Sequence, residues 1–142
     1  MVSVSLIVTT HNNSKKLNDF APVWSAYLQY VSELIIVDDC STDDTYTRLR
    51  EIFKAEKEVK IFQTSSNSGR PSVPRNLGVE KSSMDRLIYA DCDDVIPLKY
   101  LKFLTSLPAT DTSVYTLSRY DMINHDRSLL FQCVNSVSST RV

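Results

Sequence analysis

Three carboxylates fall within four residues near the middle of the chain. Asp91, Asp93 and Asp94 directly follow the apolar run Leu87–Ala90. Like charges at this spacing repel one another, and burial at the end of a strand would cost each of them its hydration. A divalent cation relieves that repulsion, because Mg²⁺ and Mn²⁺ take oxygen ligands from one or two carboxylates plus substrate phosphates. The other interpretation is a polar loop in which one Asp caps the next helix, and the short D-x-D-D pattern leaves both open.

The elements that would position this cluster alternate along the chain. Apolar runs predict strands, and residues at helical spacing predict helices between them. Strands are expected at Val2–Thr10, Glu33–Val37, Val59–Phe62 and Leu87–Ala90, and helices near 17–31, 46–53, 72–82 and 98–107. Fully apolar strands alternating with helices predict an α/β fold with a mostly parallel, Rossmann-like sheet and helices on both faces.

The chain after the last of these helices has a different pattern. Two further strands are expected at 114–123 and 129–134, with residues 124–127 as their turn. Residues 135–142 show no core pattern. We therefore expect a hairpin to follow the parallel sheet.

Polar residues follow three of the predicted strands. They are Thr9-Thr10-His11-Asn12, Asp38-Asp39 and Asp91-Cys92-Asp93-Asp94. Parallel sheets bind ligands beyond the carboxyl ends of their strands, where the strand order reverses. With Arg70 and Arg75 in a loop rich in Ser, Asn and Gly, these ends suggest a ligand that carries ribose, metal and phosphate. No G-x-G-x-x-G or G-x-x-x-x-G-K-[ST] occurs, which disfavours a dinucleotide oxidoreductase and a P-loop protein.

Composition excludes several other classes. The net charge of −1 over 142 residues gives no broad attraction to nucleic acid. The three cysteines form no C-x-x-C pair, which argues against a disulfide framework and a structural zinc site. The apolar runs are strand-length and no signal-peptide pattern is visible, so we expect a cytoplasmic protein.

Four blocks resemble a known family when taken together. VSLIVTTHN, ELIIVDDCSTDDT, NSGRPSVPRNLGVE and LIYADCDD are similar, in this order, to the nucleotide-sugar half of a family 2 glycosyltransferase with the GT-A fold. The third block most resembles bacterial enzymes that decorate wall polymers and capsules. The resemblance implies a UDP-sugar donor, Mn²⁺ or Mg²⁺ as cofactor, a saccharide or glycolipid acceptor and no nucleic-acid partner. A lipid-linked acceptor would place the protein at the inner face of the membrane.

The resemblance also implies residues on the nucleoside side of the site. Thr9 and His11 would lie in the turn that holds the uracil, with the His11 ring offering a flat face. Asp39 would accept the uracil N3–H, and Asp38 would support the loop. Asn67 would shape the opposite loop. Simpler roles remain open, with His11 as a solvated turn residue and Asp38 as a cap of its own turn.

On the phosphate side the resemblance implies a metal centre. Asp93 would be the direct metal ligand, Asp91 would bond the ribose, the sugar or the metal, and Asp94 would act through water or orient the loop. Arg75 would reach the diphosphate or the donor sugar, because a guanidinium forks onto phosphate oxygens, and Arg70 is a second candidate. Without ligand, Arg75 could instead pair with Asp91 or Asp93.

The remaining chemistry-bearing residues have structural interpretations. Trp24 stands at helical spacing and is expected in the core. Cys92 stands among carboxylates, so we expect a raised thiol pKa and a poor nucleophile. Gly69 is expected to adopt a positive φ. The run Lys54, Lys57 and Lys60 is interpreted as a solvated helix face.

The catalytic base is missing from the expected pattern. Inverting members of the family need a carboxylate that takes the acceptor proton, usually in a Glu-Asp pair after the D-x-D block. The 142 residues contain no such pair, and only Asp111, Asp121 and Asp126 follow Asp94 as acids. We therefore expect a single donor-binding domain from a longer or truncated enzyme, with an edge prone to self-association. A non-catalytic binding or assembly module and a nucleotidyltransferase are the alternatives.

Overall fold

The structure is a computed structural model. It describes residues 3–84, 86–108, 110, 113–117 and 137–141. The chain divides into two compact units, Met1–Leu107 and Pro108–Val142. The two are described separately below, and the candidate site lies in the first.

The first unit is built on a four-stranded parallel sheet. Its strands are β1 (Val4–Thr10), β2 (Glu33–Asp38), β3 (Val59–Gln63) and β4 (Arg86–Asp91). The strand order is β3-β2-β1-β4, so the chain steps outward from β1 to β3 and then returns to the other side of β1. The order therefore reverses between β1 and β4, whose carboxyl ends are in register at Thr9 and Asp91. The predicted parallel α/β sheet is confirmed.

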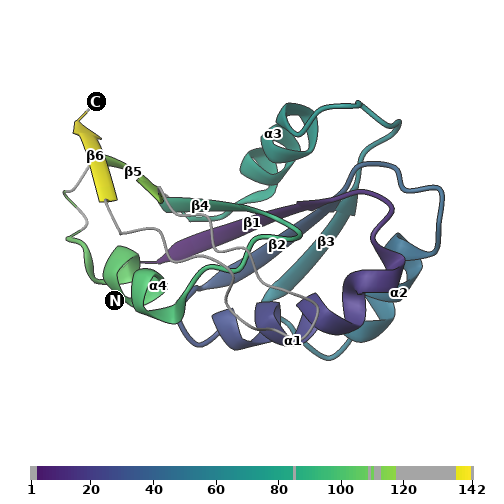
Figure 1. The fold of residues 1–142 in the computed structure, drawn as a ribbon, viewed down its shortest axis with the longest axis horizontal. Coiled ribbons are helices and arrows are strands. Elements are labelled where there is room, and N and C mark those ends of the chain that lie inside the picture. Colours follow the sequence, from purple (N-terminus) through teal and green to yellow (C-terminus); the bar gives the residue numbers. More distant parts are fainter. Residues whose placement is uncertain (1–2, 85, 109, 111–112, 118–136, 142) are drawn as a thin grey trace, which may run out of the picture. The chain divides into compact units, whose positions relative to one another are not determined.

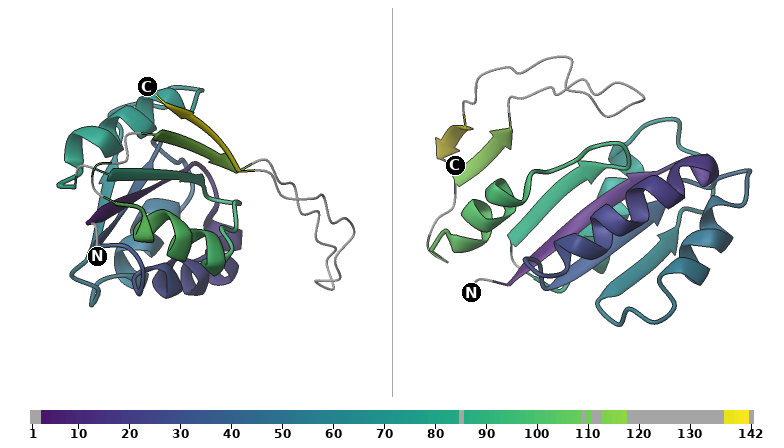
Figure 2. Two further views of the ribbon diagram at one scale, coloured as in Figure 1. Left: turned by 90° about the vertical axis from the view of Figure 1, so that its left-hand side faces the viewer. Right: turned by 60° about the horizontal axis from the view of Figure 1, so that its bottom comes forward.

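Helices cover both faces of this sheet (Figures 1 and 2). The short helix η1 (Ser14–Lys16) leads into α1 (Leu17–Tyr27), which lies on one face with α2 (Thr45–Ile52) and α4 (Leu98–Ser106). Helix α3 (Ser72–Lys81) lies on the other face. Every residue of β1 and β2 is buried as a result, which explains why these strands read as continuous apolar runs.

Trp24 lies in the larger core, beneath α1 and α2. Its side chain is 1 % exposed, and its ring stacks between Phe20 and Phe53 with centroid separations of 6.3 Å on each side. The predicted core position is confirmed. Aromatic pairs at such separations add to the stabilisation from burial, so Trp24 fixes α1 against α2.

On the opposite face, α3 approaches β1 closely at one glycine. A Cβ atom built on Gly78 would lie 2.4 Å from Cγ2 of Ile7. Ile7 is fully buried in the smaller core, which it forms with Ile35 and Val37. The absence of a side chain at Gly78 therefore sets how closely α3 packs on the sheet.

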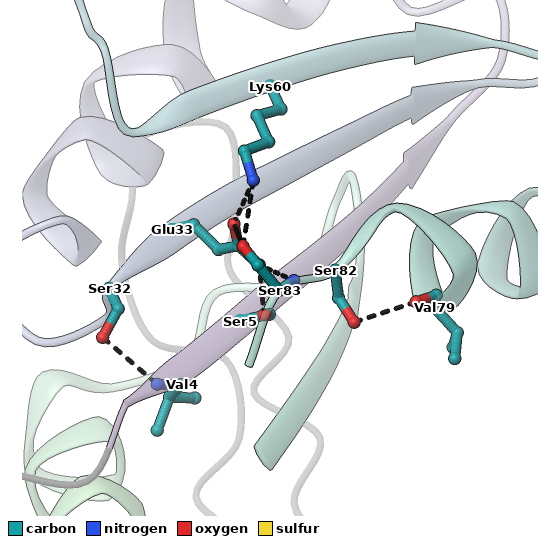
Figure 3. A network of polar contacts seen from close by, with 8 residues as sticks. All are labelled: Val4, Ser5, Ser32, Glu33, Lys60, Val79, Ser82 and Ser83. Carbon is teal, nitrogen blue, oxygen red and sulfur yellow. Dashed lines mark hydrogen bonds and ion pairs between the residues drawn. The ribbon is translucent and has the colours of Figure 1, made fainter. Parts of the chain in front are cut away.

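A buried carboxylate lies at the amino-terminal end of the sheet (Figure 3). Glu33 accepts hydrogen bonds from Ser5 Oγ at 2.5 Å and from Lys60 Nζ at 2.6 Å. The backbone N–H and the hydroxyl of Ser83 donate at 2.7 and 2.6 Å. Burial favours the neutral acid, but these bonds outweigh it and lower the pKa of Glu33 to about 2. The prediction that Lys60 lies on a solvated helix face is wrong, since Lys60 is on β3 and its ammonium group forms an ion pair with Glu33.

The second unit contains an antiparallel pair, β5 (Ser113–Leu117) and β6 (Val137–Arg141). Strand β5 overlaps the predicted strand at 114–123, whose remaining residues lie outside the described ones. The predicted strand at 129–134 and the turn at 124–127 lie outside the described residues, and β6 falls where no element was predicted. Among the described residues, no helix is long and apolar enough to span a membrane.

Candidate functional site

A cleft of about 480 Å³ opens at the carboxyl ends of β1, β2 and β4, where the strand order reverses. This is where open parallel sheets bind ligands. Its walls come from the turns after these strands and from the loop before α3. The lining residues are Thr9, Thr10, His11, Asn13, Asp39, Asn67, Gly69, Arg70, Pro71, Pro74, Asp91, Cys92 and Asp93. The predicted convergence of three polar strand ends is confirmed.

Asp39 forms one wall and is held in place by the loop opposite. Its Oδ1 accepts the Thr64 hydroxyl at 2.9 Å, and its Oδ2 accepts the Ser68 hydroxyl at 2.8 Å. The Ser68 backbone N–H donates to the same carboxylate at 3.1 Å. The side chain is 94 % buried, and an acceptor-only group in this position can take an N–H from a ligand in the cleft.

His11 faces Asp39 across the turn after β1. Its Nδ1 lies 2.9 Å from the Asp39 carbonyl oxygen, which can only accept, so Nδ1 carries the proton. Nε2 then accepts from the amide of Asn12 at 3.0 Å, and the Asn67 amide nitrogen lies over the ring, 2.9 Å from Nε2 and 3.2 Å from Nδ1. The two loops therefore clamp the imidazole ring, which excludes the alternative of a freely solvated turn residue.

Asp38 does not line the cleft. It is fully buried, and it accepts the Ser41 N–H at 2.9 Å and the Gln63 amide at 2.8 Å, together with the Ser41 hydroxyl. These bonds shape the turn after β2 and place Asp39 beside the cleft. Asp38 was predicted to support the loop beside the nucleotide, and its contacts are consistent with that role but leave no atom facing a ligand in the cleft.

The Asp91 carboxylate is bonded from two sides. Thr9, its register partner on β1, donates to Oδ1 at 3.1 Å, and Arg75 Nη2 lies 2.7 Å from the same oxygen. Arg75 is not a lining residue, and its Nε is buried without a hydrogen-bond partner among the described residues. The predicted alternative, a pair between Arg75 and Asp91 in the free protein, is what the structure shows.

Asp93 and Asp94 differ in their surroundings. Asp94 Oδ2 accepts the Asp91 N–H at 3.0 Å, so Asp94 orients the turn. Asp93 lines the cleft and, within the described part of the chain, makes no hydrogen bond or ion pair. No cluster of three or more His, Cys, Asp or Glu side chains among the described residues would hold a metal unaided. Two carboxylates on one cleft do fit a hard cation that takes its other ligands from phosphate and water.

The Cys92 thiol is a poor nucleophile, because its pKa is raised. Burial is the main cause that raises the pKa of its thiol, and Asp93 and Asp91 add to it. The predicted raised pKa of the thiol is confirmed. Gly69 also behaves as predicted, with φ of +65°.

The sequence assigned no role to two residues that line the cleft. Asn13 and Thr10 line the cleft, and the amide of Asn13 lies 3.1 Å from Thr10 Oγ1 and 2.9 Å from Cys92 Sγ. Cys92 is 79 residues from Asn13, and an Asn in a polar turn carries no distinctive spacing, so no local signal could have found this contact.

A second network joins the turns after β1 and β2. Asn12, at φ of +50°, accepts the Thr42 N–H at 2.8 Å. Asp43 accepts the N–H groups of Ser14 at 3.2 Å and Thr45 at 2.9 Å. Partial burial works against the ionised form, but these hydrogen bonds lower the pKa of Asp43. The turns that carry His11 and Asp39 therefore form one rigid support.

The fold and the cleft together define the class: an α/β protein of GT-A type with a candidate nucleotide site at the strand switch. The family model described as glycosyl transferase family 2 matches residues 5–129, and the chain belongs to this family.

Two relatives are similar to this chain in sequence. The poly(ribitol-phosphate) beta-N-acetylglucosaminyltransferase TarP of Staphylococcus aureus is 33 % identical over 131 residues, which are 91 % of this chain and 40 % of TarP. A poly(ribitol-phosphate) beta-glucosyltransferase of Bacillus spizizenii is 30 % identical over 65 % of this chain and 14 % of that protein.

A solved structure agrees with the sequence comparison. The crystal structure of S. aureus TarS 1–349 in complex with UDP-GlcNAc matches with a TM-score of 0.62 at 30 % identity. The match covers 72 % of this chain and 30 % of that one. The chain therefore spans well under half the length of the relatives it matches.

Proposed function

We propose that this chain is the donor-binding domain of an inverting family 2 glycosyltransferase that uses a nucleotide-diphosphate sugar, with UDP as the nucleotide. The observation that carries the proposal is the cleft at the β1/β4 switch, where a fixed acceptor, Asp39, and an uncommitted carboxylate, Asp93, line the same space. The UDP-GlcNAc complex of TarS, a relative with this fold, supports the choice of donor class.

On the nucleoside side we assign the base to the wall formed by Thr9, His11, Asp39 and Asn67. Asp39 accepts the N3–H of uracil, while the clamped ring of His11 offers a flat surface. Asp38 acts one step back, through the turn that carries Asp39. Hydrogen bonds within the protein already hold these side chains in position, so the wall is formed before a ligand binds.

On the phosphate side we assign Asp93 and Asp91 to a divalent cation, Mn²⁺ or Mg²⁺. Such an ion would offset the negative charge that builds on the leaving diphosphate. Arg75 donates to the diphosphate or to the donor sugar after it leaves Asp91. Arg70 lines the same cleft and is the second cation available there.

In the proposed reaction the bond from C1 of the sugar to the diphosphate breaks as C1 bonds to an acceptor oxygen. The acceptor proton goes to a carboxylate base, which we assign to residues beyond these 142, because the chain covers only 40 % of TarP and has no Glu-Asp pair. The names of the relatives favour a wall polymer as acceptor. A lipid-linked acceptor would add a peripheral place at the inner membrane face.

Calorimetric titration with UDP, with and without Mn²⁺, tests the donor site. We expect wild type to bind UDP at least tenfold more tightly with Mn²⁺ and Asp93→Ala to lose that gain. Asp44→Ala is the matched control, since Asp44 precedes α2 at the N-cap position without a side-chain capping bond and does not line the cleft. Failure of wild type to bind UDP, or an unchanged metal dependence in Asp93→Ala, would contradict the proposal.

A second experiment separates an enzyme from a binding module. Release of UDP from UDP-GlcNAc is followed with Mn²⁺ present and water as the only acceptor. Slow release that Asp93→Ala abolishes supports the transferase. Tight binding without release supports a non-catalytic module.

A further inference from the structure

Asn13 contacts all three turns that carry the proposed site. Its side-chain amide nitrogen lies 2.9 Å from the His11 carbonyl oxygen and 3.1 Å from Thr10 Oγ1, at the end of β1. The same nitrogen lies 2.9 Å from Cys92 Sγ, between the two carboxylates of the turn after β4. Its backbone N–H donates to Thr45 Oγ1 at 2.9 Å, at the start of α2.

Two other links to the carboxylate turn come from Thr9, at the end of β1. The Cys92 N–H donates to the Thr9 carbonyl oxygen at 3.1 Å, and Asp91 bonds Thr9 and Arg75. Downstream, the Ile96 N–H donates to the buried Tyr27 hydroxyl at 2.8 Å. The Asn13 amide adds a side-chain contact between Cys92 and the His11 turn, next to the hydrogen bond between the Cys92 thiol and Thr10.

We propose that Asn13 is a positioning residue that sets the spacing between the nucleoside wall and the carboxylate turn. This inference rests on the proposed function. A nucleoside diphosphate has a limited reach, so its base and its phosphates gain full affinity together only when both subsites stand at the matching separation. Asn13 lines the cleft, and in this assignment it acts through Cys92 and through the His11 backbone.

Loss of the Asn13 amide should therefore change the affinity for uridine much less than the gain in UDP affinity that Mn²⁺ provides. In Asn13→Ala the His11 turn loses the bond to its carbonyl oxygen but keeps its bonds to Asn12, Asn67 and Asp39, so uridine alone should bind within about twofold of wild type. The turn with Asp91 and Asp93 loses its contact from the Asn13 amide and keeps the bonds that Thr9 and Arg75 make there, so the gain in UDP affinity from Mn²⁺ should fall about tenfold. A merely structural role would lower uridine and UDP affinity together.

The matched control is Asn12→Ala. Asn12 is the neighbouring Asn, and its side chain joins the turns after β1 and β2 without contacting Cys92. It should weaken uridine and UDP by the same factor. Cys92→Ala should reproduce the loss seen in Asn13→Ala, and the double variant should be no worse than either single variant, because both remove the same link.

The experiment is calorimetry of uridine and of UDP with and without Mn²⁺ on the five 142-residue proteins, combined with amide hydrogen exchange of Cys92 without ligand. Faster exchange in Asn13→Ala with unchanged uridine affinity and a reduced Mn²⁺ gain supports the inference. Equal losses for both ligands, additive effects in the double variant, or unchanged exchange overturn it. Wild type that gains no UDP affinity from Mn²⁺ overturns the proposed function instead, and the exchange of Cys92 still reports whether Asn13 holds the turn.

Discussion

Arg75 and Thr9 both bond the same oxygen of Asp91, at 2.7 and 3.1 Å. The ion pair joins α3 to the end of β4 beside the cleft, with side chains 37 % and 44 % exposed. The guanidinium is therefore already next to the position that we assign to the diphosphate, and its Nε finds no partner in the described part of the chain. In the free protein Arg75 neutralises a carboxylate that would otherwise repel the ligand's phosphates.

Removal of the guanidinium should affect binding more than folding. Arg75→Ala should weaken UDP binding about tenfold, which is the range expected for a lost charged hydrogen bond. The free energy of unfolding should change by less than about 1 kcal/mol, because the pair is exposed to solvent. Arg75→Lys should restore only part of the affinity, since an ammonium cannot fork.

Calorimetry and urea unfolding measure the two effects. Arg50→Ala is the charge-matched control, because Arg50 lies on α2 over the Tyr46 ring and does not line the cleft. Equal UDP affinity in Arg75→Ala and Arg50→Ala would remove Arg75 from the donor site.

The contacts of Asp39 predict the choice of nucleobase. Uracil offers an N3–H to this acceptor and cytosine does not, so wild type should prefer UDP over CDP. Asp39→Asn should erase most of that preference. An Asn amide has only one acceptor oxygen, and if this oxygen accepts the Ser68 N–H, the NH₂ group is left to face the base as a donor. Competition titrations with UDP and CDP give the ratio, and a ratio unchanged in Asp39→Asn would exclude this wall as the base site.

The close contact between Gly78 on α3 and Ile7 on β1 predicts an effect of substitution on stability. The Cβ of Gly78→Ala would meet Ile7 Cγ2 at 2.4 Å, so the free energy of unfolding should fall by about 1–3 kcal/mol. Ile7→Ala removes the methyl group that clashes, so the double variant should be less destabilised than the sum of the single ones. Urea unfolding of the four proteins tests the contact, and simple additivity would argue against it.

The lowered pKa of Glu33 predicts how the free energy of unfolding depends on pH. Its pKa is lowered to about 2 in the folded protein from 4.5, so the folded state gains stability above pH 4.5 and loses it as the pH falls toward 2. The contribution at neutral pH is about 3 kcal/mol. Glu33→Gln should remove most of this pH dependence and lower stability at pH 7. Urea unfolding at several pH values between 7 and 2 measures it, and a parallel acid dependence in both proteins would contradict the assignment.

The sequence predicted what depends on local pattern. The four strands, the helices between them, the buried Trp24 and the positive φ of Gly69 all follow from periodicity or from one residue type. The convergence of the strand ends followed from the rule for parallel sheets.

What the sequence did not predict depends on partners distant along the chain. Lys60 was grouped with Lys54 and Lys57 as a solvated helix face although it falls in the predicted strand Val59–Phe62, because the spacing of the lysines could not show the buried Glu33 beside it. The role of Asn13 depends on Cys92, 79 residues away. Strand β6 has no apolar alternation of its own, so only its pairing with β5 reveals it.

Paramagnetic broadening by Mn²⁺ tests most directly whether the cleft holds the nucleotide and its metal. Amide spectra are recorded with UDP and substoichiometric Mn²⁺. Signals of Thr10, Cys92 and Asp93 should disappear, while those of Glu33 and Lys60, about 20 Å away at the other end of the strands, should persist. Broadening that is uniform, or that centres on the Glu33 end, would contradict a metal-dependent donor site at the β1/β4 switch.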